Sequence, residues 1–125
     1  MSLKTVEWKD NSVIMIDQTK LPNTLEYVTY TDYNQVAEAI RRLVVRGAPA
    51  IGVSGAFGLA LSALQSNATE KSDLISYMET AKKILFETRP TAVNLAWGLD
   101  KIMDVANKAT TVEEIRNNVV SYAKK

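Results

Sequence analysis

The sequence contains no cysteine and no histidine among its 125 residues. The absence of cysteine excludes disulfide bonds, thiolate nucleophiles and thiolate-ligated metals. The absence of histidine excludes imidazole acid–base chemistry and Ser-His-Asp triads. Any proton transfer by this chain would therefore have to use Asp, Glu, Lys or Tyr side chains.

The sequence also lacks an excess of charge of either sign. Its 15 Lys and Arg residues are balanced by 14 Asp and Glu residues, which leaves a net charge of +1. This balance gives no basis for expecting a nucleic-acid partner. The N-terminus has no basic segment followed by an apolar run, so we expect no secretion signal and a cytoplasmic location. The length and the apolar fraction of 46% fit one folded domain with a core.

One long stretch, residues 48–69, carries no charged residue and is long enough to cross a bilayer. Its second half contains Ser62, Gln65, Ser66 and Asn67, which dilute the hydrophobicity. This composition favours a buried helix over a membrane span. We therefore expect no membrane association.

The first part of the chain has the alternation of β-strands. Residues 5–9 and 12–17 flank the pair Asp10-Asn11, which is typical of a two-residue hairpin turn. A third strand is predicted over residues 25–31. The sequence thus predicts a small antiparallel sheet of about three strands.

From Asp32 onwards the apolar period becomes helical, with Asp32 and Gln35 as a capping box. Five helices are predicted: one ending before Gly47, then residues 49–66 and 70–86, one beginning at Pro90, and one beginning at Thr111 with Glu114 as capping partner. The predicted fold class is α+β, a small sheet followed by a helical bundle.

Two features of these helices need a reason beyond propensity. Gly52, Gly55 and Gly58 recur every third residue, although each glycine costs a helix about 1 kcal/mol against alanine. Close approach of another backbone is the expected reason, with a ligand near Gly52 as the alternative. Trp97 falls outside the apolar stripe of its helix, so it packs at the core edge or faces a partner.

A doubled motif is the most informative part of the chain. Arg46-Gly47-Ala48-Pro49 and Arg89-Pro90-Thr91 each place an arginine before a proline that suits the first position of a helix. Helix starts attract anions, and the guanidinium group matches phosphate or carboxylate oxygens. The pattern indicates an anion site for a phosphorylated small molecule, although it is equally typical of two solvated arginines in loops.

Longer segments around these arginines carry a resemblance to a known family. The nine residues 45–53 (VRGAPAIGV) and the ten residues 88–97 (TRPTAVNLAW) closely resemble the methylthioribose-1-phosphate isomerases, which are relatives of the regulatory subunits of translation initiation factor 2B. Residues 6–8, 13–18 and 25–43 match as well, so the resemblance covers essentially the whole chain.

The resemblance implies an aldose–ketose isomerase that converts methylthioribose 1-phosphate to methylthioribulose 1-phosphate in methionine salvage. It implies no metal and no cofactor, and a homodimer for the intact enzyme. The substrate-binding residues of the family correspond to Arg46, Gly47, Ala48 and Arg89 of this sequence.

The chain also departs from the family pattern. Family enzymes are much longer and carry their catalytic cysteine and aspartate in a second, Rossmann-like domain, whereas this chain has no cysteine. The resemblance therefore implies a single N-terminal domain over residues 1–125, with no catalytic residue of its own and no activity alone. We expect Tyr27, Tyr30, Asp100 and Asp104 to serve strand packing or the helix surface and not acid–base chemistry.

Three other functions stay open at this point. The chain resembles a non-catalytic regulatory module of the initiation-factor type, or part of an isomerase of another ribose phosphate. A helical domain that only mediates assembly is the third. The intact Arg46-Gly47-Ala48-Pro49 motif favours the methylthioribose-1-phosphate isomerase over these.

Overall fold

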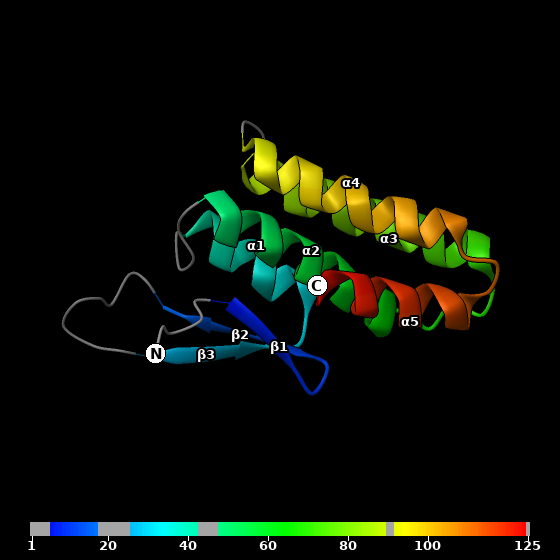
Figure 1. Cartoon of the computed structure of the whole chain (residues 1–125), viewed down its shortest axis with the longest axis horizontal. Helices are drawn as coiled ribbons and strands as arrows, with labels where there is room; N and C mark the ends of the chain where they lie inside the picture. Colours follow the sequence, from blue (N-terminus) through cyan, green and yellow to red (C-terminus); the bar gives the residue numbers. More distant parts are fainter. Residues whose placement is uncertain (1–5, 18–25, 43–47, 90–91, 125) are drawn as a thin grey trace.

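A computed structural model describes residues 6–17, 26–42, 48–89 and 92–124, and it places a small sheet beneath a helical bundle (Figure 1). The elements in chain order are β1 (Val6–Lys9), β2 (Ser12–Ile16), β3 (Tyr27–Tyr30), α1 (Tyr33–Arg41), α2 (Ala48–Gln65), α3 (Lys71–Thr88), α4 (Val93–Lys108) and α5 (Val112–Ala123). The predicted α+β class, with three strands and then five helices, is confirmed over the described residues.

The sheet is antiparallel, with strand order β1-β2-β3. The predicted turn at Asp10-Asn11 is confirmed, because these residues have φ values of 53° and 58°. Two successive positive φ values give the turn whose twist matches that of the strands, and Asp and Asn tolerate this conformation. The turn sets the register that pairs Lys9 with Ser12.

Helix α1 begins with the predicted capping box. The Asp32 carboxylate accepts a hydrogen bond from the Asn34 N–H at 2.7 Å, and the Gln35 side chain accepts one from the Asp32 N–H at 3.2 Å. The Gln65 side chain, at the end of α2, accepts a hydrogen bond from the Tyr33 N–H at 2.7 Å. The start of α1 is therefore fixed both locally and to the central helix.

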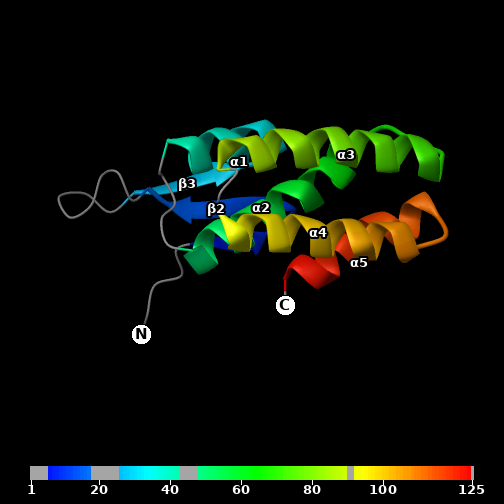
Figure 2. The same cartoon turned by 90° about the horizontal axis from the view of Figure 1, so that it is seen from above.

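Helix α2 is the centre of the domain, since it contacts all four other helices as well as β1 and β2. Figure 2 shows it running beneath the neighbouring pair α3 and α4. Its central and later turns carry fully buried apolar side chains, among them Leu59, Ala60 and Ala63. This agrees with the prediction of a buried helix, and no helix in the described part of the chain combines the length and hydropathy needed to cross a bilayer.

Small residues allow α2 and α4 to cross closely. A Cβ atom added to Gly98 would lie 2.6 Å from the Gly52 carbonyl oxygen, and one added to Gly52 would lie 2.8 Å from the Asn94 carbonyl oxygen. Backbone approach is thus confirmed for Gly52. It is wrong for Gly55 and Gly58, which face side chains instead: Gly55 meets Leu95 and Leu99, and Gly58 meets Val36 and Leu85.

The start of α4 corrects the sequence prediction. The helix begins at Val93 with Ala92 as its N-cap, and not at Pro90, which lies outside the described residues. The Ala92 N–H donates to the Arg89 carbonyl at 3.0 Å, which closes a turn between α3 and α4. Arg89 itself, with φ −150° and ψ 75°, is the C-cap of α3. A residue before proline is disfavoured in the helical region, which agrees with the end of α3 at this position.

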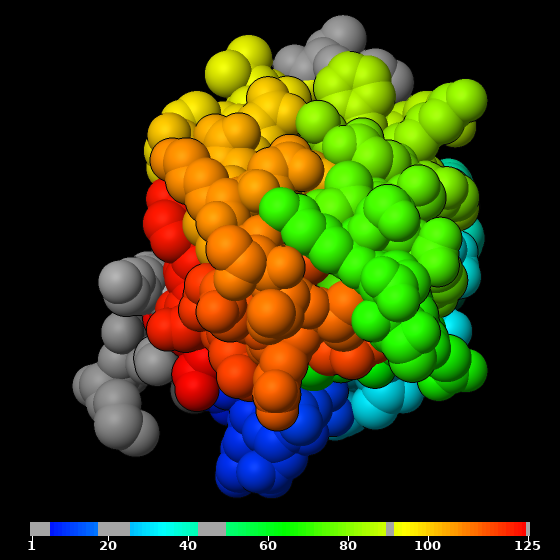
Figure 3. All heavy atoms as spheres, turned by 90° about the vertical axis from the view of Figure 1, so that its right-hand side faces the viewer, coloured from blue at the N-terminus to red at the C-terminus, as the bar shows by residue number. Residues whose placement is uncertain are grey.

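Polar side chains join the helices at the opposite end of the bundle. Arg116 of α5 donates to the carbonyl oxygens of Ala63, Ser66 and Ala68 at 2.9, 2.7 and 3.1 Å. The Lys71 ammonium group donates to the Asn107 carbonyl at 2.9 Å. Figure 3 views this end, where the α4–α5 connection and the start of α3 lie above the tip of the β1–β2 hairpin.

Candidate functional site

The predicted anion site falls only partly within the described residues. Arg46 and Gly47 lie outside them, so the roles predicted for these two residues stay predictions. Ala48 is the first residue of α2. Arg89 is described in full, at the junction between α3 and the turn that leads into α4.

The side chain of Arg89 is half-buried and keeps unused hydrogen-bonding capacity. Its Nε atom is buried and has no hydrogen-bond partner among the residues that the structure describes. A buried N–H group without an acceptor costs about 1–3 kcal/mol. The surroundings of Arg89 therefore differ from those of a fully solvated loop arginine, and its predicted binding role stays a prediction.

The first turn of α4 lies beside the second turn of α2. Gly52 meets Asn94 of α4, and Gly55, almost one turn further along α2, meets Leu95 and Leu99, so the two helices run in the same direction. Figures 1 and 2 show both helices beginning at the same end of the molecule. Their positive dipole ends therefore reinforce one another beside the segments that carry the two predicted arginines.

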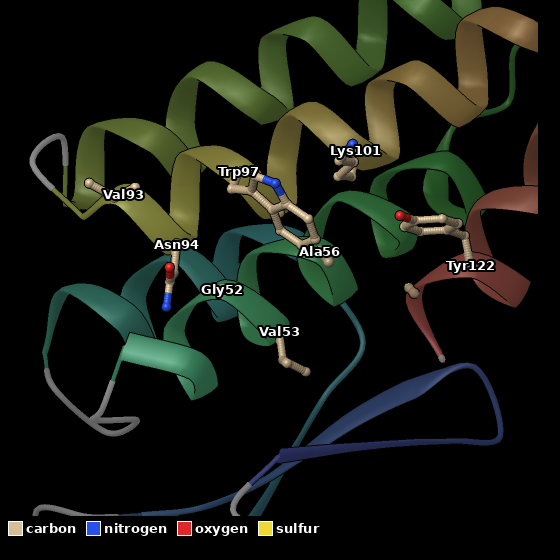
Figure 4. A pocket seen from close by; sticks show the side chains of 10 residues that line it. Gly52, Val53, Ala56, Val93, Asn94, Trp97, Lys101 and Tyr122 are labelled. Carbon is tan, nitrogen blue, oxygen red and sulfur yellow. The ribbon is translucent and has the colours of Figure 1, made fainter.

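A mainly apolar groove of about 580 Å³ opens along these two helices and reaches α5. Figure 4 shows Trp97 of α4 and Tyr122 of α5 projecting into the space over α2, with Val93 at the start of α4. Ten residues line the groove: Gly52, Val53, Ala56, Val93, Asn94, Trp97, Gly98, Lys101, Tyr122 and Ala123. Trp97 was the one residue whose position outside the apolar stripe of its helix indicated such a surface.

The side chains considered for acid–base chemistry are placed as expected. Burial, with a smaller contribution from Asp17, raises the pKa of Tyr30 above its ordinary value of 10.0, whereas the charge of Arg42 acts in the opposite direction. Tyr27 and Asp104 are exposed, and Asp100 forms an ion pair with Lys82 at 2.8 Å. No group of three or more acidic side chains in the described ranges is arranged to hold a metal ion.

Comparisons with known proteins identify the family to which this chain is related. Residues 44–125 match the pattern of the Initiation factor 2 subunit family. A methylthioribose-1-phosphate isomerase of Trichlorobacter lovleyi is 47% identical over 125 residues, which cover 98% of this chain and 36% of that protein. The protein of the same name from Geobacter sp. strain M21 is 51% identical over 106 residues, covering 85% of this chain and 31% of that protein.

Two solved structures share the fold. The crystal structure of translation initiation factor eIF-2B subunit delta from A. fulgidus superposes with a TM-score of 0.92 at 38% identity, covering 98% of this chain and 36% of that one. The 5-methylthioribose 1-phosphate isomerase of Pyrococcus horikoshii superposes with a TM-score of 0.90 at 43% identity, covering 95% and 34%. This chain spans about a third of the length of these relatives. From its sequence match and from the fold described above, the chain belongs to the Initiation factor 2 subunit family.

Proposed function

We propose that this chain is the substrate-binding N-terminal domain of a methylthioribose-1-phosphate isomerase. The observation that carries the proposal is its match to proteins of that name, at 47% identity over 98% of the chain in one and 51% identity over 85% of the chain in another. The parallel starts of α2 and α4 and the buried, unsatisfied Nε of Arg89 support a site for an anionic ligand at the same place.

In this proposal the domain binds and orients, and it does not carry out the chemistry. Arg46 and Arg89 hold oxygens of the sugar phosphate, and backbone N–H groups at Gly47 and Ala48 add hydrogen bonds at the start of α2. Glycine at position 47 lets the backbone approach the ligand closely. Holding the substrate in a reactive orientation lowers the activation barrier of a reaction that groups outside this domain carry out.

Proton transfer between C1 and C2 of the sugar falls to a second domain in the complete enzyme. The proposed partner domain supplies the cysteine and the aspartate that the family resemblance implies. The proposal also includes a cytoplasmic homodimer as the complete enzyme, which works without a metal or cofactor.

A chimera tests the binding role. This chain replaces the matched region of the Trichlorobacter lovleyi isomerase, and kcat/KM for methylthioribose 1-phosphate is measured before and after Arg89→Ala. Losing one charge-assisted contact to a phosphate or hydroxyl oxygen should lower kcat/KM by about 10- to 100-fold. Arg41→Ala is the matched control, because Arg41 is an exposed arginine of α1 that pairs with Glu38 of the same helix.

The result can contradict the proposal in two ways. An unchanged kcat/KM in the Arg89→Ala chimera rejects the role of that arginine. Turnover by the purified 125-residue chain alone, free of any longer isomerase, rejects the division between a binding domain and a catalytic domain.

A regulatory module is the second candidate, because the initiation-factor subunit from A. fulgidus shares the fold with a TM-score of 0.92. The candidate functions differ in the activity that they predict for the chimera. A regulatory module would leave the chimera inactive even when it is folded, whereas a domain evolved for another ribose phosphate would shift its preference towards that sugar. Assaying the chimera with methylthioribose 1-phosphate and ribose 1-phosphate separates these outcomes.

A further inference from the structure

We propose that Asn94 contacts the ligand of the anion site, through a hydrogen bond between its side-chain amide and a hydroxyl group of the sugar. This inference deepens the proposed function and rests on it, because it adds a residue that recognises the sugar to the arginines that hold oxygens of the sugar phosphate. The ligand class is a phosphorylated sugar with at least one free hydroxyl group.

Asn94 lies where the start of α4 meets α2. It is the second residue of α4, and the first turn of α4 lies beside the second turn of α2. A Cβ atom added to Gly52 would lie 2.8 Å from the Asn94 carbonyl oxygen and 3.3 Å from the Asn94 Cβ atom. The Asn94 side chain therefore leaves α4 on the side that faces α2, and Figure 4 shows its amide group directed towards the beginning of that helix.

The described residues give Asn94 no structural role of its own. Asparagine is a favoured N-cap, yet the N-cap of α4 is Ala92, which makes no side-chain hydrogen bond, and Asn94 comes two residues later. Within a helix, asparagine has a lower propensity than alanine or leucine. In the described part of the chain the exposed amide of Asn94 has no hydrogen-bond partner. Its donor and its acceptor are therefore available to a ligand.

The surroundings of Asn94 fit a ligand that is partly polar. The groove of about 580 Å³ has a mainly apolar lining, and its polar side chains are those of Asn94, Lys101 and Tyr122. Ligand sites commonly combine an apolar wall with a few polar groups that fix the orientation of the ligand. Of these three residues, Asn94 is the one next to the turn in which the Arg89 carbonyl accepts the N–H of Ala92.

The chemistry of an amide suits a hydroxyl group better than a phosphate. The amide NH₂ group donates and the amide oxygen accepts, which matches a hydroxyl group that does both. An ionised phosphate oxygen accepts only, and it is matched by groups that only donate. The guanidinium group of Arg89 and the backbone N–H groups at the start of α4, which no side chain caps, are such groups. The amide of Asn94 is therefore assigned to the sugar and the guanidinium group to the phosphate.

Asn94→Ala in the chimera tests the contact. Loss of the amide should raise KM for methylthioribose 1-phosphate and lower kcat/KM by about 5- to 20-fold. Inorganic phosphate, measured as a competitive inhibitor, should keep its Ki within about twofold, because it has no sugar hydroxyl group for the amide to recognise. A purely structural role of Asn94 would weaken the binding of both molecules alike.

Asn94→Asp separates binding from stability. The change is nearly isosteric, and a carboxylate in the first turn of a helix is favourable, so Tm should stay equal or rise. The same carboxylate repels the phosphate of the ligand, and it should lower kcat/KM by about tenfold or more. Asn34→Asp is the matched control, because Asn34 is the exposed second residue of α1 and lies at the other end of α2, where Gln65 binds the Tyr33 N–H. This control should leave kcat/KM unchanged.

The outcomes distinguish this inference from the proposed function. An active chimera in which both Asn94 variants keep the parent kcat/KM overturns the inference and leaves the proposed function in place. An equal rise in KM and in the Ki of phosphate for Asn94→Ala also overturns it, because the amide would then not recognise the sugar.

An inactive chimera that is folded counts against the proposed function, and the contact is then measured in the 125-residue chain itself. The NMR resonances of the Asn94 side-chain amide are assigned from their absence in Asn94→Asp. A shift of these resonances with methylthioribose 1-phosphate, and none with inorganic phosphate, supports the contact. No shift with the sugar phosphate overturns it.

Discussion

Replacing Gly98 by alanine tests whether the close crossing of α2 and α4 stabilises the domain and positions the starts of these two helices. The new methyl group would lie 2.6 Å from the Gly52 carbonyl oxygen, which belongs to the backbone of α2. Carbon–oxygen contacts are normally no shorter than about 3.3 Å, so α4 would have to move by about 0.7 Å. A backbone atom in the central helix cannot turn aside as a side chain can.

Two opposing terms set the size of the effect. Overpacking a well-packed contact costs about 1–3 kcal/mol. Alanine regains about 1 kcal/mol of helix propensity over glycine. We therefore expect Gly98→Ala to lower the free energy of unfolding by about 1 kcal/mol, which corresponds to a fall in Tm of about 4 °C for a domain of this size.

Gly58→Ala is the matched control. Its added methyl group would lie 3.0 Å from a Val36 methyl group and 3.2 Å from a Leu85 methyl group, and both are side-chain ends that can rotate. The gain in propensity should offset this smaller cost, so the free energy of unfolding should stay within about 0.5 kcal/mol of the parent. Urea denaturation followed by circular dichroism measures both variants.

The same pair of variants connects stability to function. In the chimera, Gly98→Ala should lower kcat/KM more than Gly58→Ala, because the shift displaces the start of α4 from the start of α2. If Gly98→Ala were as stable as the parent, or more stable, the two backbones would not be in the close contact that our reasoning requires.

Two further predictions concern other elements of the fold. Arg116→Met removes three charge-assisted hydrogen bonds to carbonyl oxygens at and after the end of α2. It should lower the free energy of unfolding by about 2–3 kcal/mol, as measured by urea denaturation. Arg41→Met, on the exposed face of α1, is the control and should have little effect. The pKa of Tyr30 is raised above its ordinary value of 10.0 by burial, so the folded state retains this proton more strongly and loses stability as the pH rises through and above 10.0. Tyr30→Phe should therefore reduce the loss of stability between pH 8 and pH 11, and an identical loss in parent and variant would contradict this account.

The sequence predicted correctly those turns and helix caps that depend only on residues a few positions apart. The turn at Asp10-Asn11 and the cap at Asp32 depend on residues within a few positions, and both were confirmed. Thr111 is also confirmed as an N-cap, with its hydroxyl accepting from the Glu114 N–H at 3.1 Å. The Glu114 carboxylate, however, pairs with Thr110 and not with the N-cap itself.

Predictions failed where a neighbouring segment decided the outcome. Pro90 suits the first position of a helix, yet α4 begins at Val93 because the carbonyl of Arg89 first accepts the N–H of Ala92 in a turn. Gly55 and Gly58 have the same spacing as Gly52, but only Gly52 lies where the α4 backbone crosses. A glycine periodicity indicates that space is needed, and the tertiary packing determines what fills it.

The groove could not be predicted, because three helices from distant parts of the chain form it. Trp97 alone gave a signal in the sequence, whereas Tyr122 fits an ordinary apolar stripe until the position of α5 is known. The small residues that bring α2 and α4 together also lower the floor of the groove, since Gly52 and Gly98 line it. The same crossing therefore brings the starts of α2 and α4 to one edge of the domain and leaves exposed side chains beside them.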